Sequence, residues 1–555
     1  MSSKLPPEIL SDIFSSLETD NNSLFSCCLV SREWCPPAIY WLWKRPFHIC
    51  PLPNEKLLVK TCIKLLSNDV SNMDLIQDVQ YDDTKLQQPP LFDYATFLQH
   101  LNYREIYEAA WHYLNYKNDD IDIYDEEKRL FMDQDIDDID TKYYEFDGKN
   151  NNFNEYDEQD DSDWNHESSN MSHWLINSRI LLITSMLCEL FLSHSNNIIS
   201  LNLCTSNMEC DMEYENVIDI ERINNILKLE NVSSKLTNLK KFVCGGSYNL
   251  QLIIDTMINI CHDIKILEVI FEDHKILNYS FSNLIKGQEN LEEFKFIHMD
   301  KHDINRIFND SLSNQAHSLR ILCFESCTFN NSIPFKEMSL LRNLETLILI
   351  NCRISNVQGR SLDFSFPSLK NLRIETNESF LKDVERLISH SNNLEEIVLF
   401  KRSICLSTIL DIIAIHCSKI KVLDVCVGNH CIHHVIPIFI QCHLLESIRL
   451  ELNVLGSEET IESLNILAKN IPRNLNNLSL IVDLNFKYFK EFFTQFDEVL
   501  KIYGFNTFDD IIREIDEIDE IDEYIERARH VQMKNSKDGK LCWIVLKETA
   551  PSFIW

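Results

Sequence analysis

Apolar residues return at a fixed spacing in eleven segments of the chain between residues 198 and 480. Each segment begins with an apolar residue, and further apolar residues or cysteines follow three and five positions later. Alternation of this kind predicts a short β-strand with one buried face. The first residues of the segments are Ile198, Leu239, Ile264, Leu291, Leu319, Leu344, Leu369, Leu394, Ile420, Leu445 and Leu475.

The segments follow one another at a nearly constant interval. Of the ten intervals, nine lie between 25 and 30 residues, and the remaining one, from Ile198 to Leu239, is 41. Between the strands, stretches such as 381–390 and 459–470 carry apolar residues at helical spacing. We therefore predict repeats of one strand and one helix, which must stack because one repeat cannot bury its apolar face alone.

Three repeats carry a longer pattern, with Asn or Cys eight residues after the first apolar position and another apolar residue two positions further on. The pairs are Cys327 with Phe329, Cys352 with Ile354, and Asn453 with Leu455, while Asn377 meets the first condition only. The series resembles a leucine-rich-repeat array. This resemblance implies an α/β solenoid, with a curved parallel sheet inside and helices outside.

The residues between the buried positions face the other, concave side of such a sheet. Solenoids use long curved surfaces of this kind to hold other proteins, so we expect the concave face to bind a protein substrate. The expected substrate-binding residues are Lys295, Glu325, Ile348, Arg373, Glu375, Phe400, Asp424, Arg449 and Glu451, and Ile350 lies on the same face. For any one of them, the alternative is a solvated strand position without a partner.

Three short amphipathic helices are predicted in the first 50 residues. Pro6 and Pro7 suit a helix start, and an apolar stripe follows, formed by Ile9, Leu10, Ile13, Phe14 and Leu17. A second helix is expected over 23–34, with Asn22 or Ser23 as its N-cap, and a third over 35–43. Because so small a domain buries little surface, we expect a partner to cover it.

The same residues form a recognisable motif. Residues 5–10 (LPPEIL), then Ile13, Phe14 and Leu17, then 29–32 (LVSR) with Trp34, and finally Leu42 and Trp43, resemble the F-box motif. The resemblance covers residues 4 to 47 and implies docking to the Skp-type adaptor of a cullin-RING ubiquitin ligase. The adaptor-binding residues that it implies are Leu5, Pro6, Ile9, Leu10, Ile13, Phe14, Val30 and Trp34. The alternative is a helical cap that shields the first repeat.

The remaining segments complete the expected domain organisation. We expect an F-box at 1–50, a helical connector at 51–116, an acidic disordered insertion at 117–170, the repeats at 171–485 and a helical cap at 486–555. Residues 117–167 hold 20 acidic and 5 basic residues, which favours disorder. They are either a solvated insertion or a segment that recruits a basic partner. Within the cap, 541–548 (LCWIVLKE) alternates like a terminal strand.

Composition narrows the class of function. The net charge of −34, from 86 acidic and 52 basic residues, disfavours nucleic-acid binding. The 19 cysteines are scattered and the first ten residues lack the apolar core of a signal peptide, so we expect a reducing location, cytoplasmic, nuclear or both. No apolar run approaches the length of a membrane span, and the common nucleotide-binding and hydrolase motifs do not occur.

Neither a metal nor a catalytic centre is expected. Residues 426–434 (CVGNHCIHH) contain zinc-ligand types, but Cys426 falls within a predicted strand and the spacing matches no familiar zinc finger. We therefore expect no cofactor, and the F-box resemblance implies a non-catalytic substrate receptor of a ubiquitin ligase. The alternatives are a repeat scaffold whose F-box-like helices only cap the solenoid, and an enzyme within the repeats.

Overall fold

The computed structural model contains two compact units. The first comprises residues 1–198 and 210–235, and the second 199–209 and 236–555. The described residues are 5–48, 50, 52–66, 90–115, 163–205, 220–246, 250–271, 279–298, 311–330, 335–355, 364–376, 381–400, 406–453, 466–467, 470, 472, 475, 477–482, 531–534 and 541–546.

The first unit is mainly helical. Its helices are α1 (Pro7–Ser15), α2 (Asn21–Val30), α3 (Cys35–Leu42), α4 (Leu52–Leu66), α6 (Tyr103–Asn115), α8 (Asp163–His194), α9 (Ile220–Leu227) and α10 (Glu230–Leu236). A 3-10 turn, η2 (Tyr94–Phe97), and a short strand, β1 (His100–Asn102), precede α6. In its described residues the expected connector contains two α-helices, α4 and α6, and residues 67–89 between them lie outside the described part.

Helix α8 crosses one of the expected domain boundaries. It spans Asp163–His194 and so crosses residue 170, where the acidic insertion was expected to give way to the repeats. Its second half is mostly apolar, and Ile180, Leu187 and Phe191 are fully buried, so it belongs to the core of the first unit. The rest of the insertion, 117–162, and the expected helical cap at 486–530 lie outside the described residues.

The second unit is built on a parallel sheet. The strands are β2 (Ser200–Cys204), β3 (Lys241–Gly246), β4 (Ile266–Phe271), β5 (Glu293–His298), β6 (Ile321–Glu325), β8 (Thr346–Ser355), β9 (Asn371–Thr376), β10 (Glu396–Phe400), β11 (Val422–Gly428), β12 (Ser447–Asn453), β13 (Asn477–Val482) and β15 (Leu541–Leu546). Each pairs in parallel with the next. A short β7 (Thr328–Asn330) pairs with β8, and β14 (Val531–Lys534) runs antiparallel to β15.

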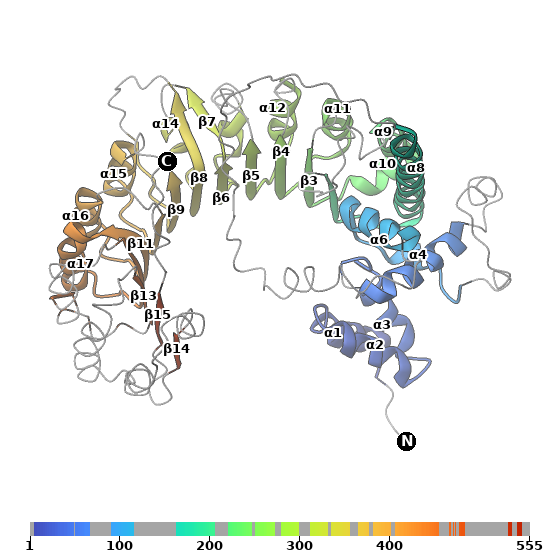
Figure 1. Cartoon of the computed structure of the whole chain (residues 1–555), viewed down its shortest axis with the longest axis horizontal. Coiled ribbons are helices and arrows are strands. Elements are labelled where there is room, and N and C mark those ends of the chain that lie inside the picture. The colour runs from blue at the N-terminus through green and yellow to red at the C-terminus, as the bar shows by residue number, and fades with distance from the viewer. Residues whose placement is uncertain are drawn as a thin grey trace. The chain divides into compact units, whose positions relative to one another are not determined.

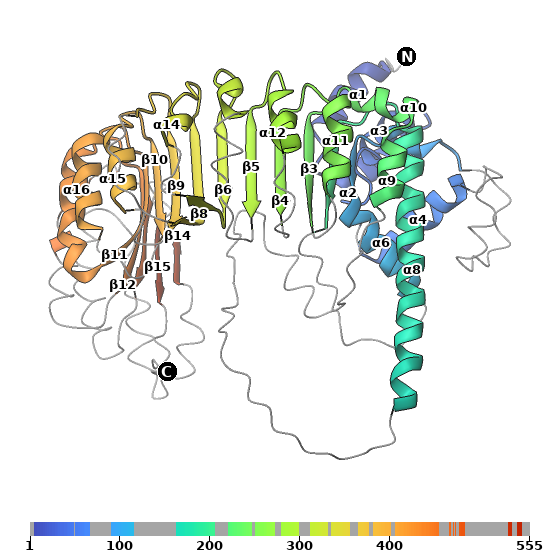
Figure 2. The ribbon, with the colours of Figure 1, turned by 90° about the horizontal axis from the view of Figure 1, so that it is seen from above.

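Helices cover one side of this sheet. They are α11 (Leu250–Ile260), α12 (Tyr279–Lys286), α14 (Phe335–Met338), α15 (Leu381–Ser389), α16 (Ser407–His416) and α17 (Val435–Gln441), with 3-10 turns η3 (Leu312–Gln315) and η5 (Asn429–His434). The strands follow an arc with the helices along its outer side (Figure 1), and β3 to β6 stand side by side in the second view (Figure 2). The expected α/β class with a solenoid-like sheet is confirmed, and β15 coincides with the predicted terminal strand.

The buried positions are those that the spacing predicts. In β4, Leu267 and Val269 are fully buried, whereas Glu268 between them is only partly so, and the same alternation recurs in β5. Cys327 and Cys352 connect neighbouring repeats, because their thiols donate to the backbone oxygens of Phe296 and Phe324 at 3.6 and 3.4 Å. Burial raises the pKa of Cys327, so its thiol keeps the proton that it donates.

A second repeating feature lies where the strands begin. The residues directly after the first apolar position alternate in charge over eight repeats, and we call them the charge ladder: Lys265, Glu292, Arg320, Glu345, Lys370, Glu395, Lys421 and Glu446. The backbone N–H of each donates to the carbonyl oxygen of the one before, at 2.7–2.8 Å. Ion pairs join Lys265 to Glu292 at 2.5 Å and Lys421 to Glu395 at 2.7 Å. These side chains are partly exposed, so each pair adds little stability by itself.

Among the described residues, no helix combines the length and the apolar character that crossing a membrane requires.

Gly245 in β3 offers a test of the packing between repeats. A Cβ atom at this position would lie 2.6 Å from Cβ of Ile270 on the next strand and 2.8 Å from its carbonyl oxygen. Because neither atom can move without shifting β4, we expect Gly245→Ala to lower the free energy of unfolding by about 1–3 kcal/mol. Thermal and denaturant unfolding of the full chain measure the change.

Gly287→Ala is the matched control. Its added Cβ would meet no atom closer than 3.3 Å, the backbone oxygen of Asn283. We expect a clearly smaller loss of stability than at Gly245, and equal losses at the two positions would contradict the close approach of β3 and β4.

Candidate functional site

The N-terminal module, α1 to α3, has a small core of its own. Leu10, Phe14, Leu24 and Ala38 are fully buried, and Leu17, Cys27, Cys28, Trp41 and Leu42 pack around them. Trp34 packs with its ring edge-on to that of Phe14, with 5.5 Å between the ring centroids. This core forms because Leu10, Phe14 and Leu17 of α1 turn inward onto α2 and α3.

The cap of α2 differs from the sequence expectation. The N-cap is Asp20, whose carboxylate accepts from the backbone N–H of Ser23 at 3.0 Å and from its hydroxyl at 2.6 Å. Asn22 and Ser23, expected as caps, lie inside the helix. The bonds from Ser23 lower the pKa of Asp20, so the cap stays ionised at neutral pH.

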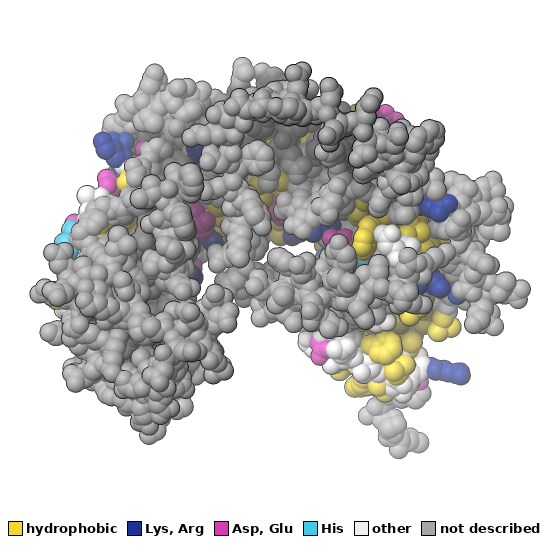
Figure 3. Space-filling model, viewed as in Figure 1, with side chains coloured by type: hydrophobic (Ala, Val, Ile, Leu, Met, Phe, Trp, Pro, Cys, Tyr) yellow, Lys and Arg dark blue, Asp and Glu magenta, His cyan; other side chains and the backbone are white. Residues whose placement is uncertain are grey.

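Six large apolar side chains of the module remain exposed. Leu5 precedes α1, Ile9 and Ile13 lie four residues apart on α1, and Phe25, Leu29 and Val30 lie on α2. We call these six residues the apolar stripes. Leu29 is the most exposed, at 73 %, and apolar side chains gather on this module in Figure 3. Exposed apolar surface of this density on so small a module is typical of a protein-binding site.

The sequence-predicted adaptor residues fall into two groups. Leu5, Pro6, Ile9, Ile13 and Val30 are exposed, and Trp34 is partly buried. Leu10 and Phe14 are 1 % and 0 % exposed, so they offer no surface to a partner, and the contact expected for them is corrected to a core role.

Phe25 and Leu29 are exposed as well, although they were not among the adaptor residues predicted from the sequence. They follow one another at helical i, i+4 spacing in α2, which was the available signal.

Trp43 and Lys44, which follow α3, contact η2 and the start of β1. The rings of Trp43 and Tyr94 stack at 4.3 Å, and the backbone N–H groups of Gln99 and His100 both donate to the carbonyl oxygen of Lys44 at 3.0 Å. The ammonium group of Lys44 lies 3.4 Å from the ring centroid of Trp41, and burial lowers the pKa of this lysine.

Further contacts join the residues that follow α3 to α6 and α8. Phe47 packs edge-on against Phe191 of α8 at 5.8 Å, and His48 bonds to Glu105 of α6 at 2.9 Å. These contacts all lie within the first unit, so the module does not move freely on a linker.

The second candidate surface is the concave face of the parallel sheet. Strand register places its residues in rows that cross the strands. One row contains Glu268, Lys295, Cys323, Ile348, Arg373, Val398, Asp424 and Arg449. A second contains Ile297, Glu325, Ile350, Glu375 and Phe400. The residues predicted from the sequence therefore do share a face. Glu268, Cys323 and Val398 lie in the same row and follow the same alternation, but they were not among the predicted residues.

Ion pairs organise the charged residues of this face. Lys295 lies 3.5 Å from Glu268 and 3.9 Å from Glu325, and Arg449 lies 3.7 Å from Asp424. Arg373 bonds to Glu375 at 2.7 Å. Burial alone would lower the pKa of Lys295, but the neighbouring carboxylates outweigh it and the net direction is upward. Lys295 therefore stays charged within the face.

Two of the expected substrate-binding residues are placed by their backbone only. Phe400 is in β10, and Glu451 pairs with Cys426 between β12 and β11, but the side chains of both lie outside the described part.

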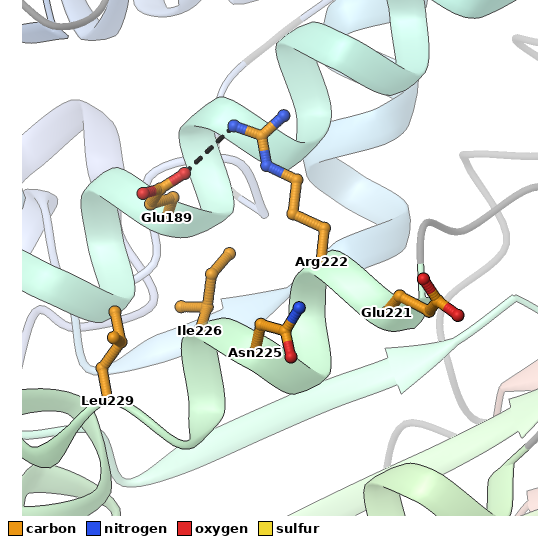
Figure 4. Close-up of a pocket in the computed structure, with 6 residues that line it drawn as sticks. All are labelled: Glu189, Glu221, Arg222, Asn225, Ile226 and Leu229. Atoms are coloured by element: carbon orange, nitrogen blue, oxygen red, sulfur yellow. Dashed lines mark hydrogen bonds and ion pairs between the residues drawn. The ribbon is translucent and has the colours of Figure 1, made fainter.

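A shallow pocket lies between α8 and α9 and is lined by Glu189, Glu221, Arg222, Asn225, Ile226 and Leu229. Arg222 of α9 forms an ion pair with Glu189 of α8 at 3.0 Å (Figure 4). The pocket is open and its walls mix polar and apolar side chains, so we assign no chemistry to it.

Metal-ligand types do not converge in the part of the chain that the structure describes: no three His, Cys, Asp or Glu side chains there could hold one ion. In the segment rich in His and Cys, His434 instead bonds to Asp411 at 2.8 Å, and Cys426 and Cys431 are buried.

Burial raises the pKa of Cys417 to about 12 and that of Cys442 to about 11, so these thiols stay protonated.

Comparison with known proteins bears on the first surface. The F-box-like family model matches residues 2–49, which contain α1, α2 and α3. The F-box prediction for this module is therefore confirmed. No curated protein matches the chain.

The division of the module into core and surface is testable with two single substitutions. We expect Phe14→Ala to cost about 3–5 kcal/mol, enough to unfold so small a module, because it empties the centre of the core. Hydrogen exchange of the full chain should then show lost protection in α1 to α3. Leu29→Ala removes an exposed side chain and should change stability by less than about 0.5 kcal/mol. Retained protection in Phe14→Ala would contradict the assigned core.

Proposed function

We propose that this chain is the substrate-recognition subunit of an SCF-type E3 ubiquitin ligase. In this proposal the N-terminal module docks to a Skp-type adaptor, and the repeats hold a protein target for ubiquitination and degradation. The F-box-like domain at residues 2–49 carries the proposal. F-box domains generally bind such adaptors, and the apolar stripes supply a surface that a partner would cover.

We assign the second unit to the leucine-rich-repeat class. The support is the interval of 25 to 30 residues in nine of ten steps and the strand-to-helix succession in a parallel sheet. The thiols of Cys327 and Cys352 add to it, because they bond to the backbone of the preceding repeat at the position where the class has Asn or Cys. The concave face, with its mixed charges and isoleucines, is then the proposed substrate surface.

The chain itself performs no chemistry in this proposal. It would bring the target close to the ubiquitin-conjugating enzyme of the ligase, so its contribution is proximity and orientation. The contacts of the module with η2, α6 and α8 support such a role, because a receptor that orients its target needs a firm mounting. We place the protein in the cytoplasm, the nucleus or both, and the free cysteines of the described part are compatible with a reducing compartment.

The adaptor proposal is tested by co-purification with a Skp-type adaptor. The variant Ile9→Asp/Leu29→Asp places a charge in each apolar stripe without touching the core, and we expect it to weaken adaptor binding at least about thirtyfold. The control is Leu340→Asp, which changes a side chain of the second unit that is 53 % exposed. It should bind the adaptor like the unmodified chain.

Two outcomes would contradict the proposal. If the unmodified chain captures no adaptor, the N-terminal helices serve as a cap and the chain is a repeat scaffold. If Leu340→Asp loses the adaptor as well, the binding does not run through the apolar stripes.

A further inference from the structure

The centre of the concave face has an unusual order of side chains. In one register row, Ile350 of β8 lies directly between Glu325 of β6 and Glu375 of β9. With strands about 4.8 Å apart, the two glutamates start about 10 Å from each other across the isoleucine. Ile348 occupies the neighbouring row of β8, between Cys323 and Arg373. Ile348 and Ile350 thus form an aliphatic strip on β8, and its Ile350 position is bordered by a carboxylate on each side.

Negative charge exceeds positive charge around this strip. Among the described residues, the ion pairs of Glu268, Glu325 and Glu375 involve two cations, Lys295 and Arg373. Lys295 is shared, and it lies closer to Glu268 than to Glu325, at 3.5 against 3.9 Å. Both bonds that Arg373 donates to Glu375 end on the same oxygen, Oε1.

The state of Glu325 is consistent with this excess. Burial raises its pKa most, the negative charges of Glu268 and Glu375 raise it further, and Lys295 and Arg373 oppose these effects without reversing the direction. The positive charge present in the face therefore compensates Glu325 incompletely, and a further cation would stabilise its ionised form.

We propose that the strip formed by Ile348 and Ile350, with Glu325 and Glu375 beside it, docks an extended segment of the target protein that carries a lysine or arginine flanked by aliphatic residues. The methylene stem of the basic residue lies over Ile350, and its cationic head reaches the carboxylates at the border of the strip. Lysine and arginine combine these two properties, since their stems cover apolar surface while their heads stay in polar surroundings.

An extended segment suits the spacing of the face. Side chains two residues apart in a strand lie on one side at about 6.8 Å, so an aliphatic neighbour of the basic residue can reach Ile348 or Cys323. An acidic segment or a phosphate would meet carboxylates and is disfavoured. The inference rests on the proposed function, because it names the class of target that the receptor would hold.

The test measures binding of short labelled peptides to the full chain at physiological salt, where long-range attraction to the acidic protein is screened beyond about 8 Å. The probe is an acetylated and amidated peptide of alternating lysine and valine. Two matched peptides replace every lysine with glutamate or every valine with serine. We expect the lysine–valine peptide to bind at least about tenfold more tightly than either of them.

Substitutions in the chain locate the site. Glu325→Gln keeps the shape and removes the charge, and it should weaken binding of the lysine–valine peptide about tenfold. Ile350→Thr keeps the branched shape, introduces a hydroxyl and should weaken binding severalfold. The matched control is Glu345→Gln, which removes one negative charge of the charge ladder, away from the strip, and should leave the affinity unchanged.

Equal binding of the lysine–valine and glutamate–valine peptides would overturn the proposal. So would equal losses from Glu325→Gln and Glu345→Gln, because binding would then follow total charge and not the strip. Circular dichroism of each variant checks folding. The outcome is independent of adaptor capture: loss of adaptor binding with peptide binding intact refutes the ligase role alone, and the reverse result refutes the docking strip alone.

Discussion

From β3 to β13, each described strand of the parallel sheet is held between the strand before it and the strand after it. The apolar residues of one strand, such as Phe294 and Phe296 in β5, are fully buried, and β4 and β6 flank them while the ring of Phe281 in α12 packs against both at 6.0 Å between centroids. Parallel pairing fixes the register at the same time, because a slip by one residue would turn the buried side chains to the concave side. Burial of the apolar side therefore also sets the rows of the concave face. Because the apolar side of each strand is held against the helices, Lys295, Glu325 and Arg373 take fixed positions on the other side.

The N-terminal module is stabilised in a different way. Its core is small, and several of its large apolar side chains point outward, so it gains less from its own folding than a larger domain would. Its contacts with the rest of the first unit, through Trp43, Lys44 and Phe47, add stability that the three helices lack by themselves. The module can therefore leave its apolar stripes exposed for a partner and still hold its shape, which a free-standing three-helix segment would do less well.

Sequence periodicity predicted the repeats well because a strand with one buried face leaves a strong local signal. It predicted which residues share the concave face, but not which of them pair, since the closeness of Lys295 to Glu268 depends on the register of two strands 27 residues apart in sequence. In the module, the spacing identified the stripe of α1 but not its division: Leu10 and Phe14 turn inward while Ile9 and Ile13 turn outward, and only the packing of α2 and α3 decides this. The cap at Asp20 was missed because Asn22 and Ser23 are equally good cap residues, and the boundary at α8 because its start is as polar as the insertion before it.

The charge ladder limits how such an array can change its length. Each member lies between two of opposite sign from Glu292 to Lys421, as with Glu395 between Lys370 and Lys421. Loss of the one repeat that carries Glu395 would bring two lysines together, whereas loss of two consecutive repeats would restore the alternation. Duplication or deletion of an even number of repeats therefore preserves the alternation of charge. An odd number leaves two like charges in neighbouring repeats, which a further substitution would have to correct.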